Sequence, residues 1–312
     1  MIKFCYNFTM HAPLDLRLLQ AFIVLVQTGS FSETSRRLGR TQPAVSLQLQ
    51  RLEEVTGAAL FTKVGRKLVL TDHGELILGY ARTIMGLQDE LQTRLAAPNL
   101  EGPVMLGTPD LYAAYLLPAV LSGFRRAHPN VNVDLTCALS SKLMAAVERA
   151  EIDLALVTGM PAFREGEIVA QEALVWVTAE SSSIHLENPV PLAMLPPGNI
   201  FRDYGLAALE SIGRTWRFAC VSESLSGLQA AVFAGIAVSV VGKSSVLPGM
   251  RILGRSESFP PLPKVDLVLY RSARRRNPAV DAMGDFIVRH FAGSALAPPR
   301  TVLTQAGSGS HE

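Results

Sequence analysis

The stretch FIVLVQTGSFSETSRRLGRTQPAVSLQLQRLEEVTG, from Phe22 to Gly57, decides the fold of the first part of the chain. With Leu16 and Leu19 before it, its apolar residues recur at helical spacing and each run ends at a glycine, which predicts three helices joined by tight turns. Ser30 and Thr41 stand where a side-chain oxygen can cap the second and third helices, and Pro43 lies in the first turn of the third. Short helices followed by a longer one with a polar face are typical of a helix-turn-helix, so DNA is the first partner to consider.

The predicted third helix exposes amides and hydroxyls, whereas a solvated helix usually shows Lys and Glu. Gln42, Ser46 and Gln48 lie on its first turns, and acidic residues appear only at Glu53 and Glu54. Amide and hydroxyl groups hydrogen-bond base edges in a major groove. An ordinary helical hairpin with a polar face is the alternative, because a helix-turn-helix is recognised by its context more than by its residues.

The residues that follow favour the DNA-binding interpretation. Leu60 to Leu70 predicts a small β-hairpin, which would serve as a wing beside the helices. Between Leu16 and Leu70 eight basic residues outnumber three acidic ones, whereas the whole chain carries a net charge of only +2. Phosphate contacts supply most of the non-specific affinity for DNA, so a local positive excess is the expected footprint of a DNA-binding domain. A solvated basic face is the alternative interpretation of this excess.

A long helix is predicted next, over residues 71–95. Its apolar seam extends from Leu76 to Leu95, and the small preceding domain has too little surface to cover it. We therefore expect this helix to pair with the same helix of a second copy, although packing back onto the wing is an alternative. Residues 96–103 contain two prolines and a glycine, which predicts a hinge.

Beyond the hinge, strands alternate with helices over residues 104–295, which predicts an α/β domain. A single helix is expected from Leu111 to Ala127, between the first two strands. Two sets of strands in roughly 190 residues suggest two lobes with a cleft. Residues 1–13, where Met10 is a possible alternative start, and the Gly-, Pro- and Ser-containing tail 296–312 are expected to be disordered.

The segment GSFSETSRRLGRTQPAVSLQLQRLEEVTGAALFTKVGRKLVLTDHGELIL, from Gly29 to Leu78, resembles the winged helix-turn-helix of LysR-type transcriptional regulators. The remaining length and layout of the chain fit that family. The resemblance implies a winged DNA-binding domain over residues 14–70, a dimer formed by antiparallel linker helices, and an effector domain similar to type 2 periplasmic solute-binding proteins. In that domain the first lobe would comprise about 104–160 and 275–295, and the second about 161–274. The chain would cross between the lobes near 158–164 and 270–277, and the last helix would pack on the first lobe.

The resemblance also implies which residues meet DNA. Gln42, Pro43, Ser46 and Leu47 would contact base edges and phosphates, and Arg66 in the wing would reach toward the minor groove. We assign Arg40, Thr41 and Arg51 to the phosphate backbone. The full set of expected DNA contacts is Arg40, Thr41, Gln42, Pro43, Ser46, Leu47, Gln48, Arg51, Arg66 and Lys67.

Leu47 is the main departure from the family's pattern, because many members carry Arg or another polar group there. A leucine cannot hydrogen-bond a base, but it can pack on the methyl group of a thymine. We therefore expect the operator sequence to differ at that step.

Effector contacts are expected at the carboxyl ends of the strands, where helix N-termini offer free N–H groups. The expected residues are Thr108, Pro109, Asp110, Ser140, Ser141, Thr158, Phe201, Ser222 and Ser224. Hydroxyls dominate this set, and Arg202 is the only cation that could turn inward to clamp a carboxylate. Helix capping is the alternative role for the hydroxyls. Asp110 would repel an anion, so the expected effector is neutral or weakly polar.

Sequence motifs give no support for an enzyme. The chain has no HExxH, no P-loop and no glycine-rich dinucleotide fingerprint, and its six histidines lack the spacing of a metal site or a catalytic triad. We expect no catalytic residues, no metal and no cofactor. A solute-binding receptor whose N-terminal helices serve another partner is the rival hypothesis.

The cysteines and the hydropathy bear on the compartment. Cys5, Cys137 and Cys220 are odd in number and far apart, and the last two stand in apolar strands, so we expect them to be buried in the core. Sparse cysteines without a secretion signal fit a reducing cytoplasm, and no uninterrupted apolar run predicts a membrane span. The sequence thus predicts a cytoplasmic homodimer or homotetramer that binds double-stranded DNA and a small-molecule effector.

Overall fold

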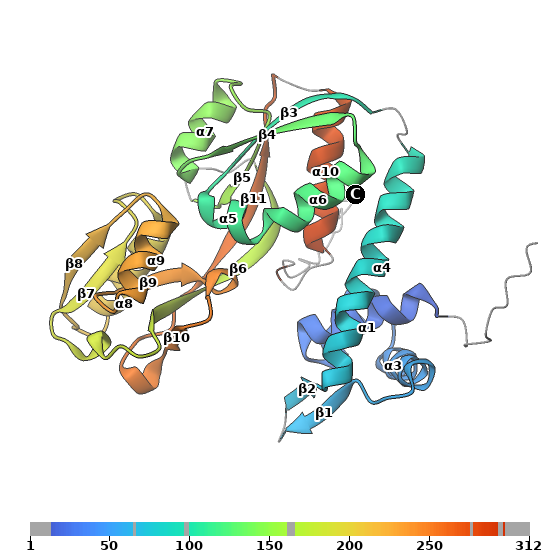
Figure 1. Cartoon of the computed structure of the whole chain (residues 1–312), viewed down its shortest axis with the longest axis horizontal. Helices are drawn as coiled ribbons and strands as arrows, with labels where there is room; N and C mark the ends of the chain where they lie inside the picture. The colour runs from blue at the N-terminus through green and yellow to red at the C-terminus, as the bar shows by residue number, and fades with distance from the viewer. Residues whose placement is uncertain are drawn as a thin grey trace, which may run out of the picture. The chain divides into compact units, whose positions relative to one another are not determined.

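The computed structural model describes residues 14–64, 67–96, 100–160, 166–274, 277–292 and 296. The chain forms two compact units, one reaching to Ala96 and the other running from Ala97 to Ala292 (Figure 1). Several expectations lie outside the described residues: those on segment 1–13, on Arg66, on the tail 297–312, and on parts of the hinge and of the two expected lobe crossings.

The first unit begins with the three predicted helices, α1 (Leu16–Thr28), α2 (Phe31–Leu38) and α3 (Gln42–Thr56). Glycines in the left-handed conformation end each of them, because a residue without Cβ adopts positive φ at little cost. The Ser30 side chain accepts a hydrogen bond from the backbone N–H of Glu33, as expected. Thr41 occupies the N-cap position of α3, but its side chain makes no capping bond, so that expectation was wrong in its detail.

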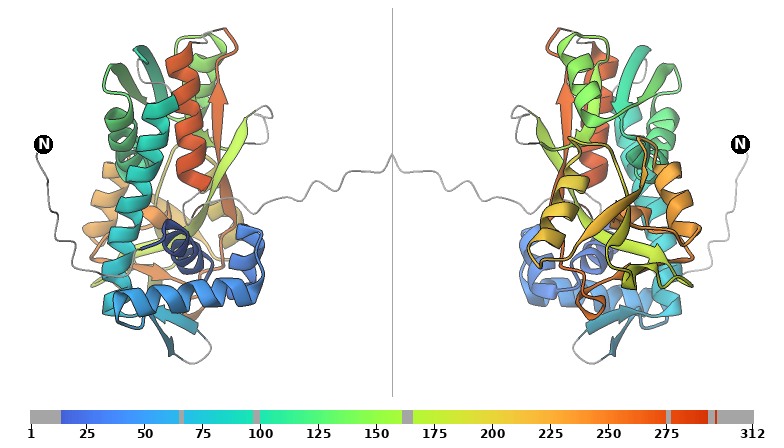
Figure 2. Two further views of the ribbon diagram at one scale, coloured as in Figure 1. Left: turned by 90° about the vertical axis from the view of Figure 1, so that its right-hand side faces the viewer. Right: turned by 90° about the vertical axis from the view of Figure 1, so that its left-hand side faces the viewer.

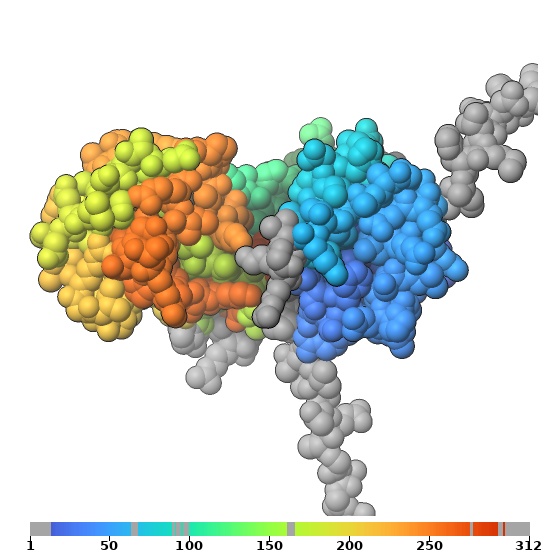
Figure 3. Space-filling model, turned by 90° about the horizontal axis from the view of Figure 1, so that it is seen from below, coloured from blue at the N-terminus to red at the C-terminus, as the bar shows by residue number. Residues whose placement is uncertain are grey.

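The predicted wing is present as the antiparallel strands β1 (Phe61–Val64) and β2 (Lys67–Leu70). It is tied to α3 because the Glu53 Oε1 atom accepts a hydrogen bond of 2.8 Å from the backbone N–H of Leu60. The side chains of Phe22, Leu52 and Leu60 are fully buried in the core beneath. In the space-filling view this unit forms the blue to cyan surface (Figure 3).

Helix α4 (Asp72–Ala96) spans 25 residues without a break (Figure 2). Its start is fixed by Thr71, whose Oγ1 atom accepts a bond of 3.0 Å from the N–H of Gly74 and donates one of 2.8 Å to the Ala59 carbonyl. A side chain at position 74 would collide with the Leu60 carbonyl oxygen, so glycine is required there. One face of α4 buries Leu78 and Ala81 in the core of the unit.

The first lobe of the second unit is built on the parallel strands β3 (Gly102–Thr108), β4 (Val131–Cys137) and β5 (Leu154–Thr158). Strand β5 is buried on both faces: Leu154 and Leu156 join the core that also contains α6 and α10, and Ala155 and Val157 join the core under α7. The helices of this lobe are α5 (Asp110–Tyr115), α6 (Leu117–Ala127), α7 (Ser140–Glu148) and α10 (Pro278–Ala292).

The single helix expected from Leu111 to Ala127 is therefore wrong, because the chain breaks between α5 and α6 at Leu116. Pro118 lies in the first turn of α6, where it lacks the N–H that a continuous helix would need. The expected packing of the last helix on the first lobe is confirmed by the contacts of α10 with β3 and α6.

The second lobe carries β7 (Val190–Met194), β8 (Trp216–Val221), β9 (Val238–Gly242) and β10 (Met250–Leu253), with β7 parallel to both β8 and β9. Its helices are α8 (Ile200–Glu210) and α9 (Leu225–Phe233), with short 3-10 turns at Ile184–Leu186, Lys243–Ser245 and Arg255–Glu257. Strand β10, which pairs with β6, was not predicted from the sequence.

The long strands β6 (Glu167–Ala179) and β11 (Lys264–Arg271) connect the lobes. Residues 167–173 of β6 pair with β11, and residues 174–177 pair with β9, so the crossing lies inside β6. Residues 267–271 of β11 pair with β5 in the first lobe. The expected lobe boundaries, 161 and 274, are therefore displaced: the return crossing precedes β11, between Leu253 and Lys264.

Candidate DNA-binding surface and effector cavity

The N-terminal half of α3 presents the residues expected to read bases. Gln42, Pro43 and Ser46 are exposed, and the exposed fraction of Leu47 is 48%, which is high for a large apolar side chain. The Gln42 Oε1 atom accepts a hydrogen bond of 3.2 Å from the Ser32 hydroxyl, which links α2 to the start of α3. The opposite side of α3 is anchored by Val45, which is buried.

The expected phosphate contacts are placed at the edges of the same surface. Arg40, Thr41 and Arg51 are exposed, and neither arginine forms an ion pair with another described residue. Arg17 and Arg36, by contrast, pair with Asp15 and Glu33.

Gln48 differs from its expected role. It is half-buried, and its side-chain oxygen is buried without a partner among the described residues. Lys67 begins β2, but its side chain lies outside the description, as does all of Arg66.

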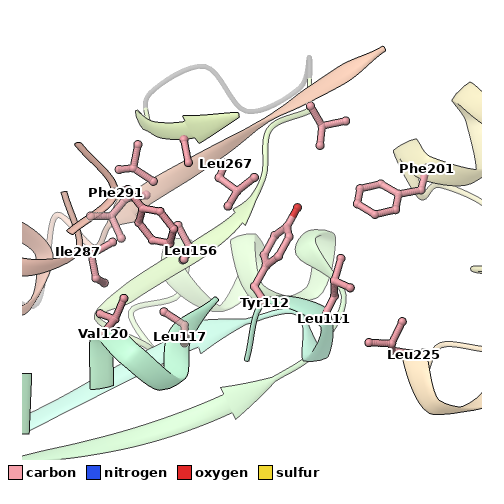
Figure 4. Close-up of a cluster of buried hydrophobic side chains, with 14 of the residues drawn as sticks. Leu111, Tyr112, Leu117, Val120, Leu156, Phe201, Leu225, Leu267, Ile287 and Phe291 are labelled. Carbon is pink, nitrogen blue, oxygen red and sulfur yellow. The ribbon is translucent and has the colours of Figure 1, made fainter. Parts of the chain in front are cut away.

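In the second unit, a cavity of about 230 Å³ lies between the two lobes. Leu111 and Tyr112 of the first lobe line one side, and Phe201 and Leu225 face them from α8 and α9 of the second (Figure 4). A second cavity of about 290 Å³ shares Leu139, Ser140, Thr158 and Asn199 with it and extends to Met160 and Pro197.

Most of the residues expected to contact an effector converge on these cavities. The first is lined by Pro109, Asp110, Ser140, Thr158, Phe201 and Ser224, and the second adds Ser141. The Thr158 Oγ1 atom lies 2.7 Å from the Tyr112 hydroxyl, with both groups buried.

Two expected residues line neither cavity. Thr108 is fully buried, and its hydroxyl donates a bond of 2.8 Å to the Leu156 carbonyl. The Ser222 hydroxyl donates to the Ser224 carbonyl at 3.1 Å and accepts from the Ser224 N–H at 3.0 Å, which closes a local turn. Helix capping, the alternative considered for the hydroxyls, is found at Ser224, whose side chain accepts a bond of 3.2 Å from the N–H of Ser226, whereas Thr108 bonds to a neighbouring strand and Ser222 to a turn.

Sequence reasoning missed Tyr112, Leu139, Asn199 and Glu223, which also line the first cavity. Asn199 had a usable signal, because it caps α8 by accepting a bond of 2.9 Å from the N–H of Phe201 and so marks a helix N-terminus. No such signal marks Tyr112 in the sequence, because an aromatic residue among the apolar residues of a helix is normally part of the core. Burial raises the pKa of the Tyr112 hydroxyl, so this group stays protonated.

Three side-chain contacts join the lobes beside the first cavity. The Asp110 Oδ2 atom accepts a bond of 2.7 Å from the N–H of Leu225, the first residue of α9. Lys142 Nζ lies 2.9 Å from a carboxylate oxygen of Glu223, and Gln229 donates to the Tyr115 hydroxyl at 2.7 Å.

The expectation that Cys137 is buried in the core was wrong. Cys137 is exposed at the end of β4 and lines the cavity, and Cys220 is half-buried. Partial burial, followed by the nearby charge of Asp110, raises the pKa of the Cys137 thiol. A raised pKa disfavours the thiolate, which is the reactive form of cysteine. Cys5 lies outside the described residues.

Comparison with known proteins identifies both units. Residues 16–75 match the bacterial regulatory helix-turn-helix protein, lysR family, and residues 98–292 match the LysR substrate binding domain. The chain belongs to the LysR family of transcriptional regulators. This confirms the expected fold class, a winged helix-turn-helix with a long helix followed by a two-lobed α/β effector domain, and a regulatory rather than an enzymatic function.

Relatives of this LysR-type regulator match along most of its length. The HTH-type transcriptional regulator DgdR of Burkholderia cepacia is 32% identical over 279 residues, which cover 89% of this chain and 95% of DgdR. PecT of Dickeya dadantii is 30% identical over 270 residues, which cover 86% of this chain and 85% of PecT. DarR of Vibrio fischeri, solved in complex with DNA, shares the fold, with a TM-score of 0.52 at 18% identity over 88% of this chain and 99% of DarR.

Within the described part of the regulator, none of the helices has the length and hydropathy needed to traverse a membrane.

Proposed function

We propose that this LysR-type regulator binds an interrupted palindromic operator as a dimer or tetramer, and that a small molecule in the interlobe cavity modulates that binding. The observation that carries the first part is the exposed N-terminal half of α3, where Gln42, Pro43, Ser46 and Leu47 gather on one surface. DarR shares the fold and was solved with DNA, which supports a DNA complex here. A regulator of this kind acts where the chromosome is, so the proposed location is the cytoplasm.

We assign base contacts to Gln42, Ser46 and Leu47, and phosphate contacts to Arg40, Thr41 and Arg51. Arginines that bind phosphates release counterions from DNA, so Arg40 and Arg51 would each contribute affinity that falls with salt. Pro43 would pack against the backbone, and Arg66 and Lys67 would bring the wing to the neighbouring groove. Gln48 is assigned a lesser role, since its side-chain oxygen is turned inward.

The oligomer is proposed to form through α4. Its side away from the core carries Leu76, Tyr80, Leu87, Leu91 and Leu95, each more than half exposed. These residues are spaced by four and seven, so they form one stripe along the helix. A second copy of α4 would cover the stripe and place the two copies of α3 against two half-sites.

Duplex binding at increasing salt tests the DNA assignment and separates it from the rival solute-receptor hypothesis. Fluorescence anisotropy with an operator fragment should show a steep salt dependence in wild type. Gln42→Ala should weaken operator binding by about 1–3 kcal/mol, because one amide reads one base pair. Glu54→Ala, near the other end of α3, is the matched control. Equal operator affinity in wild type and Gln42→Ala would contradict the assignment of α3 as the helix that reads the bases.

A further inference from the structure

The carboxylate of Asp110 occupies the place that an anionic ligand would take at α9. Its Oδ2 atom accepts a bond of 2.7 Å from the N–H of Leu225, and its Oδ1 atom accepts one of 2.8 Å from the N–H of Leu111. The first N–H groups of a helix have no partner within the helix and attract anions. At α9 the chain supplies that anion itself, from the opposite lobe.

The charged residues that line the first cavity are acidic, and one of them, Glu223, is paired with Lys142 at 2.9 Å, which leaves Asp110 as the lining carboxylate without an ion pair among the described residues. Among its described lining residues Asp110 and Glu223 are acidic, and none is Lys or Arg. Arg202, which the sequence left as a possible clamp for a carboxylate, donates to the Leu195 carbonyl at 3.1 Å and lies 4.2 Å from the centre of the Phe218 ring. Its guanidinium is therefore engaged by its own lobe.

The cavity is also lined by the Ser140 hydroxyl, which has no hydrogen-bond partner among the described residues. Ser140 is buried, with an exposed fraction of 8%, and it lines both cavities. Its side chain makes no hydrogen bond with any described residue and does not cap α7. This hydroxyl lines the cavity and can therefore donate to or accept from a polar atom of a ligand.

We propose that the effector is a small amine whose ammonium group binds to Asp110 and whose polar remainder reaches Ser140. This inference rests on the proposed function, because it takes the interlobe cavity as the effector site. Each carboxylate oxygen of Asp110 accepts one hydrogen bond from the backbone and has a second lone pair left. The ammonium can therefore bind without breaking the bond to Leu225, and it strengthens the link between the lobes.

The apolar lining limits the rest of the ligand. Leu111, Leu139, Leu195 and Phe201 contribute apolar surface to the first cavity. Its volume of about 230 Å³ is below the range typical of drug-sized sites, so a short carbon skeleton is expected. A ligand whose only charge is a carboxylate is repelled by Asp110, whereas the charge of Glu223 is balanced by Lys142.

Matched probes test the charge of the ligand. Primary amines with skeletons of about three to six carbons, with and without one hydroxyl, are compared with the primary amides and carboxylic acids of the same skeletons. Thermal shift of the full-length protein selects binders, and titration calorimetry gives their affinities. At least one amine should raise the melting temperature more than its amide, and the acids should have no effect.

Asp110→Asn should weaken amine binding by about tenfold or more, since it removes one charge at contact distance. Asparagine keeps an oxygen for the Leu225 N–H, so the link between the lobes remains. Glu210→Gln removes a charge from the exposed far end of α8 and should leave the affinity unchanged.

Amines that fail to bind, or that bind Asp110→Asn as tightly as wild type, overturn the proposal. Ala138→Leu, which narrows the first cavity, then shows whether the charge of the effector or the location of its binding site was wrong. Acids whose binding is lost in Ala138→Leu would place the effector in the cavity but make it an anion. Ligands that bind Ala138→Leu unchanged would move the effector site elsewhere and contradict the proposed function as well.

Discussion

Replacing Leu91 by Glu should dissociate the proposed dimer of the regulator. Leu91 lies within the exposed apolar stripe on α4, between Leu87 and Leu95, and its exposed fraction is 58%. The core of the first unit covers a different face of the helix, where Leu78 and Ala81 are buried. The substitution therefore changes the stripe and leaves the core of the unit intact.

The magnitude follows from the exposed surface. Full burial of a leucine is worth about 1.5–3 kcal/mol, so covering the exposed 58% is worth about 0.9–1.7 kcal/mol per copy and about 2–3 kcal/mol per dimer. A carboxylate in the same place adds a desolvation cost of roughly 1 kcal/mol or more per copy. The total of about 4 kcal/mol raises the dissociation constant of the dimer roughly a thousandfold.

Sedimentation velocity over a range of protein concentrations measures this change directly. Wild type should sediment as a dimer or tetramer, and Leu91→Glu as a monomer at the same concentrations. Arg82→Glu places the same side chain on the exposed opposite side of α4 and should leave the mass unchanged. An unaltered mass for Leu91→Glu would refute the assignment of the stripe to the interface.

Three further substitutions probe base recognition by Leu47, the core of the first unit at Leu52, and the buried Glu172 of β6. Leu47→Gln should change the preferred base at one operator position by about 1–3 kcal/mol, measured by binding to single-position operator variants, and an unchanged preference would remove Leu47 from the base contacts. Leu52→Ala should lower the free energy of unfolding of the DNA-binding domain by about 2–5 kcal/mol in denaturant titrations, and a loss well below that range would contradict its full burial. Burial raises the pKa of Glu172, so the folded state holds its proton to higher pH than the unfolded state, and stability falls as pH rises between the two pKa values. The melting temperature of wild type should therefore fall over this pH range, and Glu172→Gln should reduce the fall. Parallel pH profiles of melting temperature for the two proteins would exclude a contribution from Glu172.

The first unit was predictable from sequence because its signals are local. Glycines at 29, 39 and 57 end the helices, and Ser30 and Thr71 cap the helices that follow, so boundaries could be placed without knowing the tertiary structure. The two-faced pattern of α4 was equally local, since it depends only on helical spacing.

The second unit was less predictable where long-range contacts decide the outcome. Asp110 lines the cavity as expected, but its bond to Leu225 joins residues 115 positions apart, which no local pattern reveals. Thr108 ends a strand, where a ligand-binding hydroxyl would stand, yet its hydroxyl donates a hydrogen bond to the Leu156 carbonyl of the neighbouring strand β5. Cys137 lies in an apolar run but on the edge strand β4, whose later residues are exposed.

The lobe boundaries were displaced for a similar reason. Strands β6 and β11 each contain one continuous extended segment, and nothing in their sequence marks the point at which β6 changes partner from β11 to β9. Strand pairing, which fixes that point, depends on residues far away in the chain.

Footprinting on an operator recovered by genome-wide capture of bound DNA tests the central claim most directly. A dimer that reads DNA through α3 should protect two half-sites of like sequence in opposite orientation, separated by about one helical turn or a multiple of it, and Gln42→Ala should lose that protection. A single protected site without symmetry, or an identical footprint in Gln42→Ala, would contradict a dimer that reads DNA through α3.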